Sequence, residues 1–208
     1  MTAKLPAPPS RLADKAPFDP TEIAAGTLWA RVYSAGGLHP GSWDRFRTYG
    51  PLATGRFDHH LEPPGDGQRA IMYLAGSLQT CTAEAFQAAR VVDRRHNEPW
   101  LVAFRLARSV RLCDLTGTWP TKAGASQAIS TGRRDRSRQW ARAIHEAFPE
   151  ADGILYRSSM DSGRPCMALF ERASTAVPDA PELHLPLSHP GLVMDLATIC
   201  TLIGYRLV

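Results

Sequence analysis

The stretch of residues 70–86 reads AIMYLAGSLQTCTAEAF, and it contains the two patterns that decide the fold. Residues 70–75 form a short apolar run, which predicts a buried β-strand. Ser77 or Thr80 can cap a helix that we expect to run to about Arg95. A buried strand followed directly by a helix indicates a domain that combines both kinds of element.

Further elements are predicted on both sides of this stretch. Alternating or β-branched residues predict strands, and apolar residues at a spacing of three to four predict helices. The strands are expected at residues 27–34, 45–49, 55–59, 101–106, 109–114, 153–156, 166–171 and 205–208, the helices at 126–131, 134–148 and 192–203, and a polar loop at 62–69. The sequence therefore predicts a single α+β domain of short strands with about three helices.

The size and composition of the chain are those of a globular protein. It has 208 residues, of which 44% are hydrophobic. We expect a Pro-rich arm at residues 1–20 and one domain at residues 21–208. No apolar stretch approaches the roughly 20 residues that span a bilayer, and the arm lacks the apolar segment of a secretory signal. These features predict a cytoplasmic protein.

The cysteines and histidines give little support for a metal site. The four cysteines are far apart and form no C-x-x-C pair. This pattern predicts free, mostly buried thiols in a reducing compartment. The run Asp58-His59-His60 superficially resembles the metal-binding run of phosphoesterases, but the other motifs of those enzymes are missing. We therefore favour a polar strand end there and expect no metal.

Positive charge is unevenly distributed along the chain. The formal net charge is +4, and arginines gather between Arg133 and Arg142. A mild basic excess suits an anionic ligand, an acidic partner or nucleic acid. For the Arg133–Arg142 cluster we favour a solvated helix face, then a surface that meets an acidic partner, then a nucleic-acid site. Only Trp140 is interleaved with these arginines, so stacking on bases has weak support.

Several well-known nucleotide and hydrolase motifs are absent. The sequence contains no G-x-x-x-x-G-K-[ST], no H-E-x-x-H and no G-x-S-x-G. The run Gly65-Asp66-Gly67 follows prolines rather than a strand, so it does not fit the dinucleotide-binding fingerprint. If the chain binds a dinucleotide, it does so without a Rossmann or P-loop site.

Five short pieces occur in a characteristic order along the chain. They are Arg31 in an early strand (LWARVYS), GRF at residues 55–57, YLA at residues 73–75, Glu84 in a helix (TAEAF) eleven positions after Tyr73, and Ser158 after a late strand (GILYRSS). This ordered set resembles the RES domain, a family named for its Arg, Glu and Ser, over about residues 27–172. Many family members have proline before the serine, where this chain has Arg157.

The resemblance implies a fold related to the ADP-ribosyltransferases, with two small sheets around a cleft. It also implies a toxin of a bacterial toxin–antitoxin pair that degrades NAD⁺, its substrate, and is held in check by an Xre-type antitoxin. NAD⁺ breaks between ribose C1′ and the charged nicotinamide, which leaves as a neutral molecule. The transition state therefore resembles an oxocarbenium ion, and a fixed carboxylate nearby can stabilise its positive charge.

This chemistry suggests roles for three catalytic candidates: Glu84, Arg31 and Tyr73. Glu84 would stabilise the ribosyl cation; alternatively, an acid in the first helical turn only offsets the helix dipole. Arg31, on a predicted strand face with Trp29 and Tyr33, would face the pyrophosphate or ribose, or is simply a surface arginine. Tyr73 would stack on nicotinamide and offer its hydroxyl to the ligand, or is simply a core tyrosine.

The predicted NAD⁺-binding set contains two more residues besides Arg31 and Tyr73. Ser158 would donate to a phosphate or to the nicotinamide carboxamide, although Ser159 can take that place because the register is open by one residue. Arg56 would hold a phosphate, or forms an ordinary salt bridge.

Three functions remain open from the sequence. The first is an NAD⁺ glycohydrolase or phosphorylase, with water or inorganic phosphate as the acceptor. The second is an ADP-ribosyltransferase that modifies a protein, but such enzymes often carry an acidic residue two positions before the glutamate, where this chain has Thr82. The third is a non-enzymatic basic module whose binding to nucleic acid would be sensitive to salt.

Overall fold

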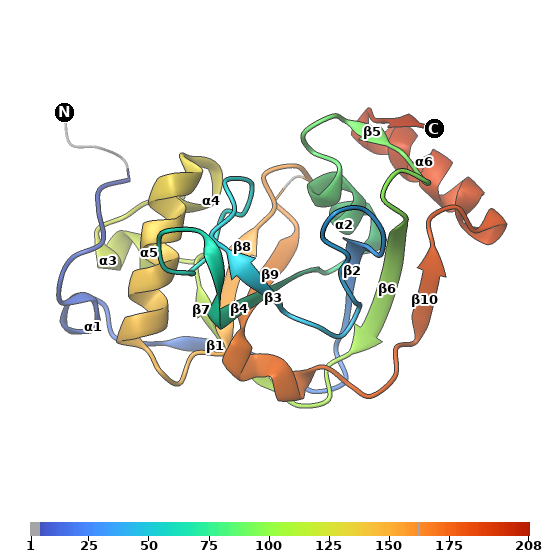
Figure 1. The fold of residues 1–208 in the computed structure, drawn as a ribbon. Coiled ribbons are helices and arrows are strands. Elements are labelled where there is room, and N and C mark those ends of the chain that lie inside the picture. The colour runs from blue at the N-terminus through green and yellow to red at the C-terminus, as the bar shows by residue number, and fades with distance from the viewer. Residues whose placement is uncertain (1–4, 162) are drawn as a thin grey trace.

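The structure is a computed structural model that describes residues 5–161 and 163–208. The first four residues of the predicted arm lie outside the described part. A large sheet crosses the molecule, with helices packed around it (Figure 1). The strands in spatial order are β1 (Pro20–Ile23), β7 (Val110–Asp114), β8 (Gly153–Arg157), β9 (Pro165–Phe170), β4 (Gly65–Ala75), β2 (Leu28–Ser34), β6 (Pro99–Arg105) and β10 (Leu183–Pro186), with β3 (Arg47–Gly50) paired to β4; β5 (Val91–Val92) and β11 (Arg206–Leu207) form a second, two-stranded sheet.

The large sheet has two parts that meet at a narrow junction. β2 and β4 are paired at Ala30 and Ala75 alone, whereas β2 pairs with β6 over seven residues and β4 with β9 over five. The two strands therefore diverge from the Ala30–Ala75 pair. The resemblance implied two small sheets, and the structure has one sheet that narrows to a single residue pair between its two parts.

Both faces of β4 are covered, which explains the apolar run at residues 70–75. Ile71 and Ala75 belong to one buried cluster, and Met72 and Leu74 belong to another on the opposite face. This alternation is the expected period of two for a strand. The predicted buried strand is thus confirmed.

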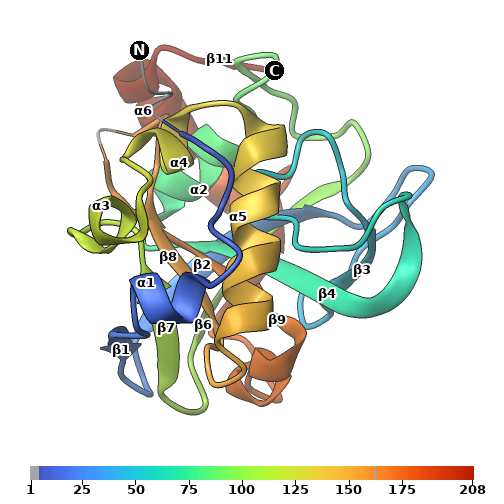
Figure 2. The ribbon, with the colours of Figure 1, turned by 90° about the vertical axis from the view of Figure 1, so that its left-hand side faces the viewer.

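The helices are few and mostly short. They are α1 (Leu12–Lys15), α2 (Leu78–Ala85), α3 (Trp119–Ala123), α4 (Ala128–Thr131), α5 (Arg134–Ala147) and α6 (Val193–Ile203), with 3₁₀ turns η1 (Glu171–Ala176) and η2 (Pro190–Leu192). In the described part, α2, α5 and α6 are the helices with eight or more residues. Figure 2 shows α5 lying across one face of the sheet. Its residues Trp140 and Ile144 are fully buried there, as predicted.

The helix after the apolar strand is shorter than predicted. Ser77 is its N-cap, and the Ser77 hydroxyl accepts a hydrogen bond from the Thr80 amide. The helix ends at Ala85 rather than near Arg95. The chain then enters β5, which pairs with β11 from the C-terminus. Pairing between distant parts of the chain therefore takes the place of the last expected helical turns.

Two other local predictions were wrong. Residues 55–59 form no strand, and part of the loop expected at residues 62–69 belongs to β4, which begins at Gly65. The strands expected at 101–106 and 109–114 are confirmed as β6 and β7, with a bend between them, and they do not pair with each other. They lie in different parts of the sheet, because β6 pairs with β2 and β10 while β7 pairs with β1 and β8.

The arm and the cysteines are integrated into the domain. Leu12 and Ala16 are buried in the core, and the Trp140 indole donates to the Pro6 carbonyl at 2.9 Å. All four cysteines are free and buried, as predicted. Within residues 5–161 and 163–208, none of the helices has the length and apolar character needed to cross a bilayer.

Candidate active site

A cavity of about 450 Å³ lies beside the narrow junction of the sheet. Its lining comes from β2, β4, α2, the segment 52–56, the start of α5 and the loop after β8. Arg31, Arg56, Tyr73 and Glu84 all line it. The structure thus brings together residues from four separate pieces of the sequence.

Glu84 lies near the end of its helix rather than near its start. Because α2 begins at Leu78 and ends at Ala85, Glu84 is in the last turn, and the predicted first-turn position was wrong. A carboxylate near a helix C-terminus is disfavoured by the helix dipole. Helix stability therefore does not explain this residue, and its position needs another reason.

The Glu84 carboxylate is held on both oxygens. The Ser158 hydroxyl donates to Glu84 Oε1 at 2.5 Å, and the Gln87 side-chain amide lies 3.3 Å from Oε2. Ser158 in turn accepts the backbone amides of Met160 and Asp161, both at 3.0 Å. The loop after β8 therefore fixes Ser158, and Ser158 fixes the carboxylate.

The two serines that the sequence left open occupy different positions. Ser158 is buried, with 4% of its surface exposed, and is turned toward Glu84. Ser159 lines the cavity. Ser159 is therefore the serine on the cavity surface, and Ser158 contacts the Glu84 carboxylate behind it.

The cavity has a marked excess of positive charge. Its lining contains four arginines, and Glu84 is the one acidic residue among the described lining residues. The arginines are Arg31, Arg47, Arg56 and Arg134. Across the described residues, Arg47 is the one of these four with a carboxylate within 4.0 Å, namely Asp58 at 2.6 Å. Three unpaired guanidinium groups around one cavity favour an anionic ligand.

Arg31 extends from β2 into this cavity. Its guanidinium lies 5.6 Å from the centre of the Tyr33 ring, so the predicted sharing of one strand face is confirmed for that pair. Arg31 Nη1 lies 3.3 Å from the Arg45 carbonyl. Burial lowers the pKa of Arg31 to about 10. The fold therefore holds a half-buried cation that has no carboxylate partner within 4.0 Å among the described residues.

Arg56 and Arg134 lie on another side of the cavity. Arg56 donates to the Gly132 carbonyl at 2.7 Å, and burial together with the nearby Arg134 lowers its pKa. Arg134 donates to the Gln87 side chain at 2.7 Å, and Gln87 reaches Glu84. Sequence reasoning counted Arg134 only as one member of the Arg133–Arg142 cluster, because nothing in the sequence separates it from its neighbours.

The Tyr73 hydroxyl is already occupied by protein groups. It donates to Asp58 Oδ1 at 2.8 Å and accepts the Phe57 amide at 2.9 Å. Burial, reinforced by the Asp58 carboxylate, raises the pKa of Tyr73 well above its usual value. Tyr73 can therefore offer its ring to a ligand. Its hydroxyl, which was predicted to donate to the ligand, donates to Asp58 in this structure.

The Arg133–Arg142 cluster is largely used inside the protein. Arg133 is exposed and pairs with Asp135, as expected for a solvated helix face. Arg138 lies 3.3 Å from the carbonyls of residues 52 and 53, and Arg142 lies 3.2 Å from the His60 carbonyl. These two arginines therefore attach α5 to the segment that forms one wall of the cavity.

The comparisons with known proteins agree with this picture. Residues 28–188 match the family model of the RES domain. The chain belongs to the RES domain family.

A solved structure shares the fold of this RES domain. The M. tuberculosis MbcT–MbcA toxin–antitoxin complex contains a chain that matches it with a TM-score of 0.58 and 16% identity, over 90% of this chain and 95% of that one. At this identity the likeness establishes a common fold. A search of curated protein sequences gave no match.

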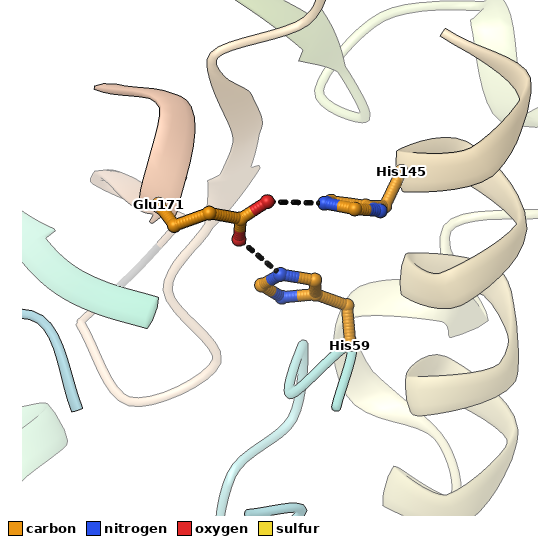
Figure 3. Close-up of side chains that lie close together, drawn as sticks. All are labelled: His59, His145 and Glu171. Carbon is orange, nitrogen blue, oxygen red and sulfur yellow. Dashed lines mark hydrogen bonds and ion pairs between the residues drawn. The ribbon is translucent and has the colours of Figure 1, made fainter. Parts of the chain in front are cut away.

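A second polar cluster of the RES domain lies outside the cavity. His59, His145 and Glu171 have ligating atoms within 4.8 Å of one another, and both imidazoles point at the Glu171 carboxylate (Figure 3). Such a set can in principle hold a transition metal. However, Arg172 Nη2 lies 2.7 Å from His145 Nε2, so a guanidinium already supplies positive charge there. We interpret the group as a hydrogen-bonded cluster around the Glu171 carboxylate, with Arg172 as the cation beside it.

This cluster also corrects the prediction for the Asp58-His59-His60 run. These three residues are buried but belong to no strand. His59 Nε2 lies 2.9 Å from Glu171 Oε2. Burial alone would raise the pKa of Glu171, but the hydrogen bonds from His145 and His59 outweigh it and hold that pKa well below its usual range. The run therefore attaches the cavity wall to the body of the domain.

The RES domain is expected to lose stability in mild acid through His59. Burial lowers the pKa of His59 to about 4. In the unfolded chain His59 binds a proton below about pH 6.5. In the folded chain it stays neutral until the pH falls to about 4. The free energy of unfolding should therefore fall by about 2 kcal/mol between pH 8 and pH 5 through this residue alone. Urea unfolding of the wild type and of His59→Gln at both pH values measures this loss.

The control is His96→Gln, because His96 is exposed. It should keep the wild-type difference between the two pH values, whereas His59→Gln should lose most of it. An equal pH dependence in His59→Gln and the wild type would show that His59 is not the responsible group.

Proposed function

We propose that this RES domain cleaves the bond between nicotinamide and ribose in NAD⁺. The observation that carries the proposal is one carboxylate, Glu84, fixed by Ser158 beside a cavity lined by four arginines. The arginines suit the two negative charges of a pyrophosphate, because guanidinium groups bind phosphate oxygens in a planar fork. The carboxylate suits the positive charge that develops on the ribose.

In this proposal each lining residue has a defined task. Arg31 and Arg56 bind the pyrophosphate, and the Tyr73 ring packs against nicotinamide. The C1′–N bond breaks, and nicotinamide takes the bonding electrons and leaves neutral. Glu84 stabilises the ribosyl cation until an oxygen of water or inorganic phosphate bonds to C1′ and releases a proton where the acceptor is water. Ser158 supports this step by orienting Glu84, and Ser159 faces the ligand.

The shape of the sheet supports the proposed relation to the ADP-ribosyltransferase fold. That fold was expected to place two small sheets around a cleft. Here the two parts of the sheet meet at one residue pair, Ala30 with Ala75, and both residues line the cavity.

A transferase acting on a protein is the second candidate function. Transferases of this kind often have a second acid two positions before the glutamate. Thr82 stands at that position, is fully buried and is not part of the described cavity lining. This favours a small acceptor over a protein side chain. The nucleic-acid alternative loses support because Arg138 and Arg142 are engaged with backbone carbonyls.

The proposed biological role is that of a bacterial toxin, acting in the cytoplasm and neutralised by an Xre-type antitoxin. Its support is the RES family and the fold shared with a chain of a toxin–antitoxin complex. Expression of the chain alone should arrest growth, and co-expression with the antitoxin from the same operon should restore it.

Incubation of the pure protein with NAD⁺ tests the proposed reaction directly. Nicotinamide should appear in stoichiometric amounts with the loss of NAD⁺. Reactions with and without inorganic phosphate then identify the acceptor, because water gives ADP-ribose and phosphate gives a phosphorylated ADP-ribose. No nicotinamide under either condition would refute the proposal, and steep salt-dependent binding of nucleic acid would favour the alternative.

A further inference from the structure

One wall of the cavity has no regular secondary structure. Residues 51–60 form neither helix nor strand, yet Leu52, Thr54, Gly55 and Arg56 all line the cavity. A wall without a hydrogen-bonded ladder has to be held by side chains. The position of these lining residues therefore depends on whatever anchors the segment.

Asp58 is a central anchor of this wall. It is fully buried, and its carboxylate accepts three hydrogen bonds: from the Leu52 amide at 2.8 Å, from the Tyr73 hydroxyl at 2.8 Å and from Arg47 Nη2 at 2.6 Å. Leu52, Tyr73 and Arg47 line the cavity, whereas Asp58 does not. One buried anion thus connects the wall, the floor strand β4 and a lining arginine on β3.

The backbone closes tightly around this carboxylate. A Cβ on Gly55 would lie 2.1 Å from Asp58 Oδ1, so any larger residue there would displace the carboxylate. The Phe57 amide donates to the Tyr73 hydroxyl, which completes the ring of contacts. The segment is therefore shaped to enclose one acidic side chain.

We propose that Asp58 is a positioning residue for NAD⁺ binding, which acts by holding Arg47, Tyr73 and the wall segment 52–56 at the distances the substrate requires. This rests on the proposed function. Asn in place of Asp58 keeps the shape but removes the charge that holds Arg47, and an amide cannot accept three hydrogen bonds as a carboxylate does. Substrate binding should suffer more than the chemical step, because Glu84 is held separately by Ser158.

Asp58→Asn in the full chain tests this proposal, with Asp152→Asn as the matched control. Asp152 is also buried and paired with an arginine, Arg108 at 2.7 Å, and it accepts the Arg111 amide, but none of these three lines the cavity. Asp58→Asn should raise KM for NAD⁺ by about tenfold or more while kcat stays within about threefold. Asp152→Asn should leave KM unchanged, whatever its effect on stability.

A purely structural role for Asp58 predicts a different result. Loss of folded protein lowers kcat through the active fraction and leaves KM unchanged, and that outcome would overturn the proposal. Arg47→Met should raise KM by a similar factor. Adding Asp58→Asn to Arg47→Met should raise KM by a smaller factor than Asp58→Asn does in the wild type. Equal and independent effects of the two substitutions would also contradict the proposed coupling.

A measurement without NAD⁺ separates this proposal from the proposed function. Amide hydrogen exchange at Leu52 and Phe57 should be faster by about tenfold or more in Asp58→Asn than in Asp152→Asn. If the wild type releases no nicotinamide, the proposed function fails, but the exchange rates still decide whether Asp58 holds the wall. Unchanged exchange at both amides would refute the positioning role.

Discussion

Glu84→Gln is expected to lower the rate of nicotinamide release from NAD⁺ by roughly two to three orders of magnitude without unfolding the protein. The substitution keeps the size of the side chain and an oxygen for the Ser158 hydroxyl, which donates to Glu84 at 2.5 Å. It removes the negative charge, and with it the stabilisation of a ribosyl cation. Since Glu84 is the one acid among the described lining residues of the cavity, no neighbour there can replace it.

The fold should tolerate this change, because a carboxylate at a helix C-terminus opposes the helix dipole. Circular dichroism and thermal unfolding of Glu84→Gln should match the wild type. Glu150→Gln is the control, since Glu150 is exposed and does not line the cavity; it should retain full activity. Turnover of Glu84→Gln within a few fold of the wild type would exclude the assigned role.

Ser158 provides an independent check of the same mechanism. Ser158→Ala should slow the reaction by about tenfold, because it releases the carboxylate rather than removing it. The double variant with Glu84→Gln should be no slower than Glu84→Gln alone, since residues that act as one unit give non-additive losses.

The fold could be predicted where a pattern is local. The run at residues 70–75 has the composition of a buried strand, and β4 has both faces covered. The helix of residues 134–148 follows from its apolar spacing, and α5 spans nearly the same residues. Predictions failed where the decision was made by distant partners. The helix after Ser77 ends early because β5 pairs with the C-terminus, a pairing that no local pattern specifies.

The candidate site was found through the order of short motifs, and not through its geometry. That order located Arg31, Arg56, Tyr73 and Glu84, which all line one cavity. It did not distinguish Ser158, which holds the Glu84 carboxylate, from Ser159, which lines the cavity.

The residues that sequence reasoning missed are recognisable only in three dimensions. Arg47 and Arg134 look like ordinary surface arginines in the sequence. Asp58 stands out in the sequence only as part of the Asp58-His59-His60 run, and its three hydrogen bonds to residues around the cavity appear only in the fold. Side chains that act from irregular segments leave no pattern in the sequence, because their role depends on what the fold brings to them.

Arg31→Met is expected to lower kcat/KM for NAD⁺ by about two orders of magnitude and to leave the free protein as stable as the wild type, or more stable. Burial lowers the pKa of Arg31 to about 10, and across the described residues no carboxylate lies within 4.0 Å of it. Arg31 is half-buried, and a charge partly removed from water without a carboxylate partner is unfavourable for folding. An apolar side chain of similar length removes that cost, but it also removes the group that binds the pyrophosphate.

Two measurements test whether Arg31→Met weakens ligand binding while it leaves the free energy of unfolding unchanged or higher. Urea unfolding without ligand should give Arg31→Met an unchanged or higher free energy of unfolding. With saturating ADP-ribose the wild type should be stabilised and the variant should not, because a ligand stabilises a protein only to the extent that it binds the folded state.

The control for Arg31 is Arg105→Met, because Arg105 is paired with Glu182 at 2.5 Å and does not line the cavity. It should change neither kcat/KM nor the response to ADP-ribose. A large loss of stability in Arg31→Met with kcat/KM preserved would show that Arg31 serves the fold instead of the substrate. The expected result, lost binding without lost stability, would mean that the domain keeps a half-buried cation without a carboxylate partner in its cavity for an anion that comes from outside.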